Sequence, residues 1–299
     1  SAASDVYKRQ DISAKDLRKI ISDAKKRKKL RKKLSHLDVD KDTPLKGKLL
    51  IQMFEKSSLR TRLSFYLAIR QLGGSTLTLR PNELHLSKGG ESIEDTAKIL
   101  SNFGNAFMLR TDSDKKLEEF KKHLSIPVIN GLSPSSHPTQ ILSDIFTVEE
   151  IKKKPIHKLN IAWIGDCNNV LNSLIAASIK FSFKLKIGCP KKYKPDKNII
   201  DYIQKNKNKI DIYSSPKKAV FNADVLFSDK VISINDKVNK LEKTISQIIV
   251  AESMILMGYV TSLFIDKYNL AAAFRIQKLN CNPCLLYTSD AADEEDSVD

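Results

Sequence analysis

Short apolar segments alternate with segments of helical periodicity along most of this 299-residue chain. A short apolar run is typical of a strand buried on both faces, and repeated strand–helix units predict parallel sheets covered by helices. The predicted strands are 49–54, 75–79, 106–110, 126–130, 159–165, 185–189, 210–213 and 225–228. The predicted helices are 13–34, 58–72, 91–103, 114–124, 137–151, 168–182, 196–206 and 216–222.

The units fall into two groups separated by the basic segment 152–155, which we interpret as a linker. This grouping predicts an α/β protein with two doubly wound parallel-sheet lobes, joined by a helix, and an active site in the cleft between them. Ligands of such sheets bind beyond the carboxyl ends of the strands. Helix 58–72 has one apolar face, formed by Leu59, Leu63, Tyr66 and Leu67.

The composition argues against a nucleic-acid-binding protein, a disulfide scaffold and a zinc site. Lys and Arg number 51 against 35 Asp and Glu, a net charge of +16. The lysines form scattered runs without interleaved aromatic residues, which favours a solvated surface over nucleic-acid binding. Four cysteines are too few for a disulfide scaffold, and the single C-x-x-C of Cys281 and Cys284 lacks the second pair of a zinc site. We expect a cytoplasmic enzyme, with no nucleic-acid or membrane partner.

Both ends of the chain are read as foreign sequence. Residues 5–10 back-translate to a transposon end used in sequencing libraries, and the reverse complement of that DNA encodes residues 284–289. We therefore expect 1–10 and 284–299 to be adapter-like, which leaves 11–283 as a natural, C-terminally truncated fragment.

Five polar clusters lie where predicted strands end. In 54–62, Ser58 is placed as a helix N-cap, and Arg60 and Thr61 add donors that match phosphate oxygens. An ordinary capped helix would give the same pattern. Arg110 ends a buried strand, and His137 with Gln140 opens a helix and could polarise a carbonyl; a strand end and a capping histidine are the plain alternatives.

The other two clusters lie in the second group of units. Asn168 and Asn169 belong to the motif 165–169, which follows the predicted strand 159–165. Two side-chain amides there could bind a carboxylate or cap a helix. The single glycine excludes a dinucleotide-binding loop. Asp229 ends the strand 225–228 and could bind an ammonium group.

Taken together in this order, the motifs resemble those of the aspartate/ornithine carbamoyltransferases, and the ornithine branch in particular. The chain is similar to F-E-K-x-S-T-R-T-R at 54–62, M-I-R-T at 108–111, P-V-I-N-G-L at 127–132, and H-P-T-Q at 137–140. Further matches are a Gly-Glu-Ser landmark at 90–97, G-D-x-N-N at 165–169, and D-x-x-x-S-M at 229–234. The resemblance covers about residues 45–235.

The resemblance implies transfer of a carbamoyl group from carbamoyl phosphate to the δ-amino group of ornithine, in arginine metabolism, by a homotrimer without metal or organic cofactor. It implies domains at 11–150, for carbamoyl phosphate, and 156–283, incomplete, for ornithine. Arg110 and His137 would be catalytic. Carbamoyl phosphate would be bound by Ser58, Leu59, Arg60, Thr61, His85, Arg110, His137 and Gln140. Ornithine would be bound by Asn169, with Asn168, and by Asp229, Ser233 and Ile234.

Several positions depart from the family pattern. Leu59 stands where the family has Thr, His85 where a neighbouring subunit supplies Gln, and Ile234 where Met is usual. The H-C-L-P motif of the ornithine site is absent, and Cys281 is only a faint echo of it. The apolar run 248–265 is interpreted as a core helix or out-of-frame translation rather than a membrane span.

Three alternatives stay open at this point. A carbamoyltransferase for another amine, such as putrescine, would differ in how Asp229 and the asparagines face the acceptor. A truncated remnant without activity would follow from the missing H-C-L-P segment. A basic nucleic-acid binder would show salt-dependent DNA retention that carbamoyl phosphate does not change.

Overall fold

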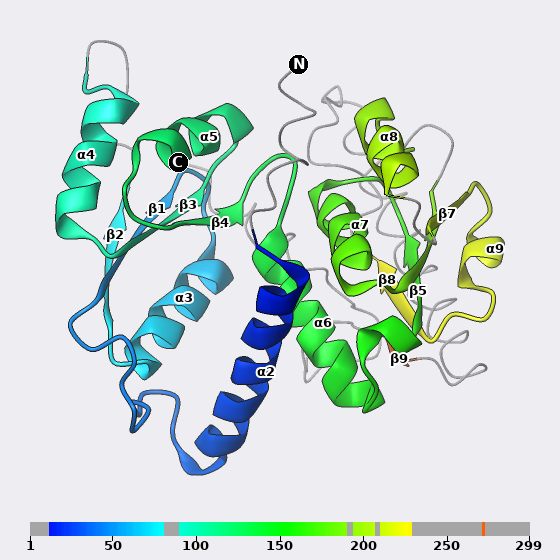
Figure 1. Cartoon of the computed structure of the whole chain (residues 1–299), viewed down its shortest axis with the longest axis horizontal. Coiled ribbons are helices and arrows are strands. Elements are labelled where there is room, and N and C mark those ends of the chain that lie inside the picture. The colour runs from blue at the N-terminus through cyan, green and yellow to red at the C-terminus, as the bar shows by residue number, and fades with distance from the viewer. Residues whose placement is uncertain (1–11, 81–89, 190–193, 207–209, 229–270, 273–299) are drawn as a thin grey trace, which may run out of the picture. The chain divides into compact units, whose positions relative to one another are not determined.

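The computed structural model describes residues 12–80, 90–189, 194–206, 210–228 and 271–272. The chain divides into two compact units, one made of residues 15–140 and the other of residues 1–14 with 141–299. The boundary at residues 140 and 141 falls inside helix α6 (Pro138–Lys152). Each unit contains one parallel sheet with helices, as the alternation of segments predicts (Figure 1).

The first unit contains a four-stranded sheet in the order β2-β1-β3-β4, with all neighbouring strands parallel. Its strands are β1 (Leu49–Phe54), β2 (Ser75–Leu79), β3 (Ala106–Arg110) and β4 (Val128–Leu132). Its helices are α2 (Ala14–Leu30, which starts at the unit boundary), α3 (Leu59–Gln71), α4 (Ile93–Phe103) and α5 (Asp114–His123), with a 3₁₀ turn at Arg31–Lys33. The chain moves outward from β1 to β2 and then returns to β3, so the strand order reverses between β1 and β3.

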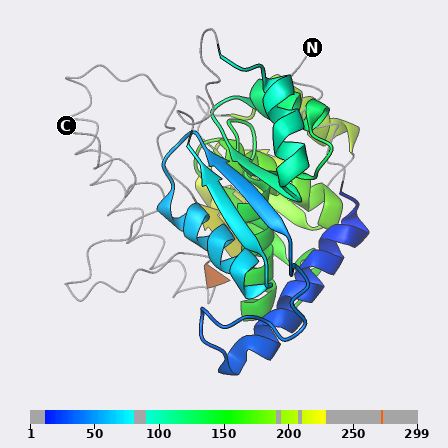
Figure 2. The same cartoon turned by 90° about the vertical axis from the view of Figure 1, so that its left-hand side faces the viewer.

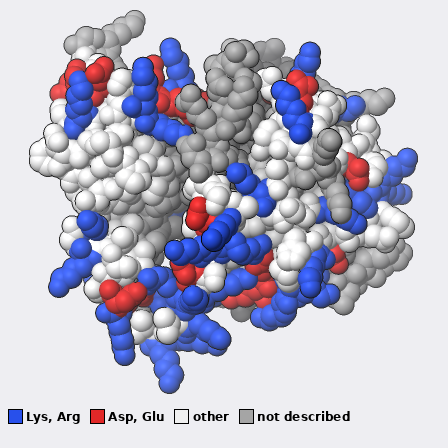
Figure 3. Space-filling model, viewed as in Figure 1, with Lys and Arg blue, Asp and Glu red and all other residues white. Residues whose placement is uncertain are grey.

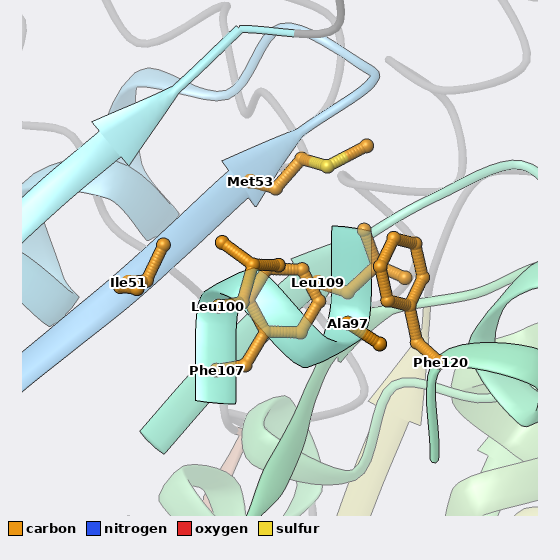
Figure 4. Packing of buried hydrophobic residues seen from close by; sticks show 7 residues of the cluster. All are labelled: Ile51, Met53, Ala97, Leu100, Phe107, Leu109 and Phe120. Atoms are coloured by element: carbon orange, nitrogen blue, oxygen red, sulfur yellow. The ribbon is translucent and has the colours of Figure 1, made fainter. Parts of the chain in front are cut away.

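The connections of this sheet determine which face each helix covers. Because strand–helix–strand crossovers are right-handed, the reversal puts α3 on one face and both α4 and α5 on the other. Buried residues on the α4–α5 side form the core of the unit, and Phe107 and Phe120 meet there with ring centroids 5.1 Å apart (Figure 4). The cluster consists of Ile51, Met53, Ala97, Leu100, Phe107, Leu109 and Phe120.

Helix α3 forms where the sequence predicts it, but the structure leaves its apolar face largely exposed. None of its thirteen side chains, all within the described ranges, is buried. Leu59, Leu63 and Tyr66 are 59%, 46% and 41% exposed. The helix contacts the edge strand β2, and Figure 2 shows it lying along that edge. An edge strand offers only a narrow surface, so these apolar side chains remain open on the unit.

Helix α2 carries a dense group of basic side chains, and Lys and Arg gather over it in the space-filling view (Figure 3). Part of this charge is neutralised locally. Arg31 pairs with Asp40, and Arg27 contacts Asp42 at 2.9 Å and Asp40 at 2.8 Å. The hydrogen bond from Arg27 lowers the pKa of the Asp42 carboxyl. These pairs fasten the C-terminal part of α2 to the segment that precedes β1.

The second unit contains a five-stranded parallel sheet in the order β7-β6-β5-β8-β9, which reverses between β5 and β8. Its strands are β5 (Asn160–Ile164), β6 (Lys184–Gly188), β7 (Ile210–Tyr213), β8 (Val225–Ser228) and β9 (Ala271–Ala272). Its helices are α7 (Asn169–Phe181), α8 (Lys197–Lys205) and α9 (Pro216–Val220), with a 3₁₀ turn at Ile156–Lys158 after α6.

Two features explain how the second sheet is covered. Helix α7 buries nine residues, among them Leu171, Leu174 and Ile175, which accords with its many apolar and small side chains. On β6, a Cβ added at Gly188 would lie 2.9 Å from the Cβ of Ala219, so glycine lets α9 approach the strand closely. The sequence predicts every strand of this sheet except β9.

Candidate functional site

The segment between β1 and α3 places a helix N-terminus at the carboxyl edge of the first sheet. Ser58 occupies the N-cap position, as predicted, with an extended backbone. Its side chain makes no capping hydrogen bond within the described residues, and the first turn of α3 contains no acidic residue. The amide groups of a first turn attract anions. Leu59 is exposed and Arg60 half-buried in this turn, so the predicted phosphate-binding residues sit together at a helix N-terminus.

Arg110 joins this helix N-terminus to the neighbouring strand. It lies at the end of β3, opposite Phe54 in the β1–β3 ladder, and is only 8% exposed. Its Nη1 donates a hydrogen bond to the Thr61 Oγ1 at 3.3 Å. A guanidinium removed from water in this way attracts an anion more strongly than an exposed one does. The structure thus brings Arg110 and Thr61, which are 49 residues apart, into one cluster.

A buried carboxylate, which the sequence interpretation gave no role, organises the same edge. Glu55 accepts hydrogen bonds from the hydroxyl of Thr111 and from the ammonium group of Lys116, and it is 10% exposed. Its amide donates to the Arg110 carbonyl at 2.9 Å. The amide of Thr111 donates in turn to the Leu132 carbonyl at 3.0 Å. The ends of β1, β3 and β4 are therefore fixed to one another around Arg110.

A serine-rich turn leads from β4 to the predicted catalytic histidine. The Nδ2 of Asn130 donates to the Ser136 Oγ at 2.9 Å, and the amide of Ser133 donates to the Ser136 carbonyl at 2.9 Å. Ser135 donates to Asp114 at 2.7 Å, which fastens the turn to α5. His137 follows directly and is half-buried.

His137 and Gln140 thus follow the end of β4, where Leu132 pairs with Arg110, and they lie at the start of α6. The sequence interpretation overlooked these serines. The only available signal was the cluster of four Ser and Pro residues at 133–136.

The loop after β5 presents the predicted amide pair of the second unit. Gly165 has a φ of 143°, which turns the chain, and the indole of Trp163 donates to the Asp166 carbonyl at 3.1 Å. The Asn168 Oδ1 accepts from the two amides of Val170 and Leu171 at 3.0 and 3.1 Å. Asn168 is therefore the N-cap of α7, the capping alternative, and Asn169 begins the helix.

Four predicted site residues lie outside the described residues, namely His85, Asp229, Ser233 and Ile234. The described strand β8 ends at Ser228, immediately before Asp229. Among the described side chains, no three His, Cys, Asp or Glu residues form a group that could hold a metal ion. No helix in the described ranges combines the length and apolar character that crossing a membrane requires.

The residues around Arg110 in the first unit and around Asn169 in the second unit both lie where ligands bind in open parallel sheets. Arg110 and Glu55 lie at the carboxyl ends of β3 and β1, and the strand order of the first sheet reverses between these two strands. In the second sheet the order reverses between β5 and β8, and Asn169 follows β5. Such reversals are the usual ligand sites of this architecture. The first cluster is suited to a phosphate-bearing ligand, because it combines a helix N-terminus with a buried guanidinium.

Comparison with known proteins gives two adjoining family matches. Residues 4–150 match the aspartate/ornithine carbamoyltransferase carbamoyl-P binding domain, and residues 157–258 match the Asp/Orn binding domain of the same family. These matches extend beyond 45–235, the range that the motifs covered.

Individual relatives agree with the family matches. The chain is 42% identical over 220 residues to the ornithine carbamoyltransferase of Caulobacter vibrioides, covering 74% of this chain and 70% of that protein. It is 40% identical over 230 residues to the ornithine carbamoyltransferase of Agrobacterium fabrum, covering 76% of this chain and 73% of that protein.

Solved structures agree as well. The ornithine carbamoyltransferase of Pyrococcus furiosus is similar with a TM-score of 0.68 at 35% identity, covering 76% of this chain and 71% of that one. The anabolic ornithine carbamoyltransferase of Campylobacter jejuni is similar with a TM-score of 0.66 at 34% identity, covering 78% of this chain and 75% of that one.

Proposed function

The chain belongs to the aspartate/ornithine carbamoyltransferase family, and from this membership together with the site geometry we infer that it transfers the carbamoyl group of carbamoyl phosphate to the δ-amino group of L-ornithine. The products are citrulline and phosphate. The observation that carries this function is the buried Arg110 beside Thr61 in the first turn of α3. That pair supplies a positive, partly desolvated site for the phosphate group of an acyl phosphate.

The reaction forms one bond and breaks another at the carbamoyl carbon. The δ-nitrogen of ornithine attacks this carbon, a C–N bond forms, and the C–O bond to phosphate breaks with its electron pair leaving on phosphate. The amine gives up one proton, which the departing phosphate is able to accept. Negative charge develops on the carbamoyl oxygen during attack, so fixed donors aimed at that oxygen lower the barrier.

We assign the phosphate to the first turn of α3, through Ser58, Leu59, Arg60 and Thr61. Arg110, His137 and Gln140 would contact the carbamoyl group, with Arg110 and His137 as the catalytic residues. The network of Glu55 supports this assignment, because it holds Arg110 in place from the backbone side. His85 stands where the family has a Gln supplied by a neighbouring subunit, and we assign it to carbamoyl phosphate as well.

The amino-acid end of ornithine is assigned to the second unit. Asn169, Asp229, Ser233 and Ile234 would hold the α-carboxylate and the α-ammonium group. Asn169 follows β5 at the reversal of the strand order, which supports this assignment. The corresponding domains are 11–150 for carbamoyl phosphate and 156–283 for ornithine.

The exposed apolar side chains of α3 support a homotrimer. Leu59, Leu63 and Tyr66 lie beside the edge strand β2, on which Leu77 is 46% exposed. An exposed apolar face next to an open sheet edge is typical of an interface between subunits. Light scattering after size exclusion would give the mass of three chains, and Leu63→Lys would reduce it.

We also propose that the enzyme acts in arginine metabolism in the cytoplasm. The free thiols of Cys167 and Cys189 are consistent with a reducing compartment.

A steady-state assay tests the proposed function. Purified chain receives carbamoyl phosphate with ornithine, putrescine or aspartate, and ureido product and phosphate are measured. We expect product with ornithine and a loss of at least a hundredfold in kcat/KM for Arg110→Met, since removal of one such donor costs about 10²–10³ in rate. Arg70→Met, an exposed position in the last turn of α3, serves as the control. Preference for putrescine, or no product and no carbamoyl phosphate binding, would refute the assignment.

A further inference from the structure

Asn130 is a polar side chain in an otherwise apolar strand. It lies on β4 and pairs with Leu109 of β3, a member of the buried cluster of the first unit. The Asn130 Oδ1 is buried and makes no hydrogen bond to any of the described residues. A buried polar atom without a partner lowers stability, so packing alone would favour an apolar residue at this position. Asn130 therefore points to a task other than packing.

The side-chain amide of Asn130 holds the turn that follows β4. Its Nδ2 donates to the Ser136 Oγ at 2.9 Å and to the Ser133 Oγ at 3.3 Å. The two serine hydroxyls lie 3.3 Å from each other. Ser133 is 0% exposed, so its hydroxyl depends on the protein rather than on water for hydrogen bonds. One strand residue thus fixes both ends of the turn 133–136.

The backbone of this turn leads directly into His137. The Ser133 amide donates to the Ser136 carbonyl at 2.9 Å, which holds the peptide group that joins Ser136 to His137. On the other side, Pro138 begins α6 and restricts the His137 backbone to extended conformations. Because the main chain is constrained on both sides of His137, the location of its imidazole depends on where the turn holds Ser136.

We propose that Asn130 and Ser136 are positioning residues for His137. They fix the main chain from which the imidazole reaches the carbamoyl group, and this role rests on the proposed function, which makes His137 catalytic. A displacement of about 1 Å in a positioned group can cost about 10²-fold in rate. Loss of the hydrogen bond between Asn130 and Ser136 should therefore lower kcat by about ten- to hundredfold. The KM for carbamoyl phosphate should change less, because its phosphate is assigned to the first turn of α3.

Two variants remove this hydrogen bond from its two sides. Asn130→Leu replaces the amide by an apolar group of similar size, and Ser136→Ala removes the hydroxyl without a change on the strand. Ser136→Thr keeps a hydroxyl and should retain most of the wild-type kcat. The matched control is Asn105→Leu, at the amino end of β3, where the Asn105 Oδ1 accepts from the Leu49 amide at 2.9 Å. This control breaks a side-chain hydrogen bond at the opposite end of the same sheet and should leave kcat unchanged.

Double variants of the full chain separate positioning from general damage. If Asn130 acts through His137, then Asn130→Leu lowers kcat by about tenfold or more in the wild type. Added to His137→Ala, the same change should lower kcat by less than about twofold, because the group that it positions is already gone. A merely structural role would lower kcat by the same factor in both backgrounds. Equal factors, or a wild-type kcat in both Asn130→Leu and Ser136→Ala, would overturn the proposal.

The imidazole resonances of His137 give a readout that does not require the reaction. Among the five histidines, they are the signals that the His137→Ala spectrum lacks. We expect Asn130→Leu and Ser136→Ala to shift them and Asn105→Leu to leave them unchanged. A lower kcat with unshifted resonances would overturn the proposal. Shifted resonances in variants of a protein whose wild type makes no citrulline would leave the link between Asn130 and His137 standing and refute the proposed function instead.

Discussion

Replacement of Glu55 by glutamine would remove one buried negative charge from the edge of the first sheet. Glu55 accepts hydrogen bonds from Thr111 and Lys116 with its two carboxylate oxygens. A glutamine side chain has one oxygen and one NH₂ group. One of the two donors would therefore face another donor and lose its partner. Lys116 would also lose the opposite charge.

The size of the effect follows from the burial of the pair. Breaking a fully buried ion pair costs about 3–5 kcal/mol, and a hydrogen bond to a charged group is worth about 1.5–3 kcal/mol. Glu55 is 10% exposed, but Lys116 is 30% exposed and regains water. We therefore expect Glu55→Gln to lower the free energy of unfolding by about 2–3 kcal/mol, near the upper end for a single hydrogen bond.

Urea unfolding followed by far-ultraviolet circular dichroism measures this loss. The matched control is Glu94→Gln, which removes the same charge from a solvent-exposed pair with Lys98 at 2.9 Å and should cost much less stability than Glu55→Gln. Because Glu55 also fixes Arg110, the kcat/KM for carbamoyl phosphate should fall about tenfold while the KM for ornithine changes less. Equal destabilisation by the two variants would refute the reasoning, as would normal kinetics in a destabilised Glu55→Gln enzyme.

Three further predictions address the core, a helix cap and the dependence of stability on pH. Phe107→Ala, at 0% exposure, should cost about 3–5 kcal/mol in urea unfolding, whereas Phe103→Ala, at 74% exposure, should cost under about 0.5 kcal/mol; similar losses would contradict the packing in Figure 4. Asn168→Ala removes the cap of α7 and should cost about 1 kcal/mol, and an unchanged midpoint would show that the cap contributes nothing. Burial raises the pKa of Tyr202, so the stabilisation that its neutral form provides is complete below the ordinary value of about 10 and is lost as pH rises through the raised value. Stability should therefore fall more steeply above pH about 10 in the wild type than in Tyr202→Phe, and identical slopes would exclude this cause.

The strands could be predicted from the sequence because they are short apolar runs, and β1, β3, β5 and β8 are buried along most of their length. Predicted and observed bounds agree within about a residue for most strands, and β1, β2, β3, β7 and β8 coincide. The exception is β4, which was placed at 126–130 and runs from Val128 to Leu132. Pro127 has no amide to donate to the ladder, and the register shift at Arg110 lets Leu132 pair at the far end.

The parts that could not be predicted depend on contacts between distant residues. The periodicity of α3 correctly indicated a helix, but it did not show that the sheet ends at β2 and leaves that face uncovered. The motif at 54–62 contains Glu55, yet its role depends on Lys116, 61 residues later in sequence. By contrast, the positions of Ser58 and Arg110 follow from local sequence, because Ser58 stands between a strand and a helix and Arg110 ends a buried strand.

The hydrogen bonds that close the site are also the last rungs of the first sheet, at the end where strands fray most readily. The Glu55 amide reaches Arg110, and the Thr111 amide reaches Leu132. When these hydrogen bonds open, the groups that bind carbamoyl phosphate move apart. The apparent affinity for carbamoyl phosphate therefore falls as the fraction of molecules with these bonds open rises. Hydrogen exchange at these two amides would measure that fraction directly. A core substitution far from any ligand can therefore weaken binding merely by making this edge open more often.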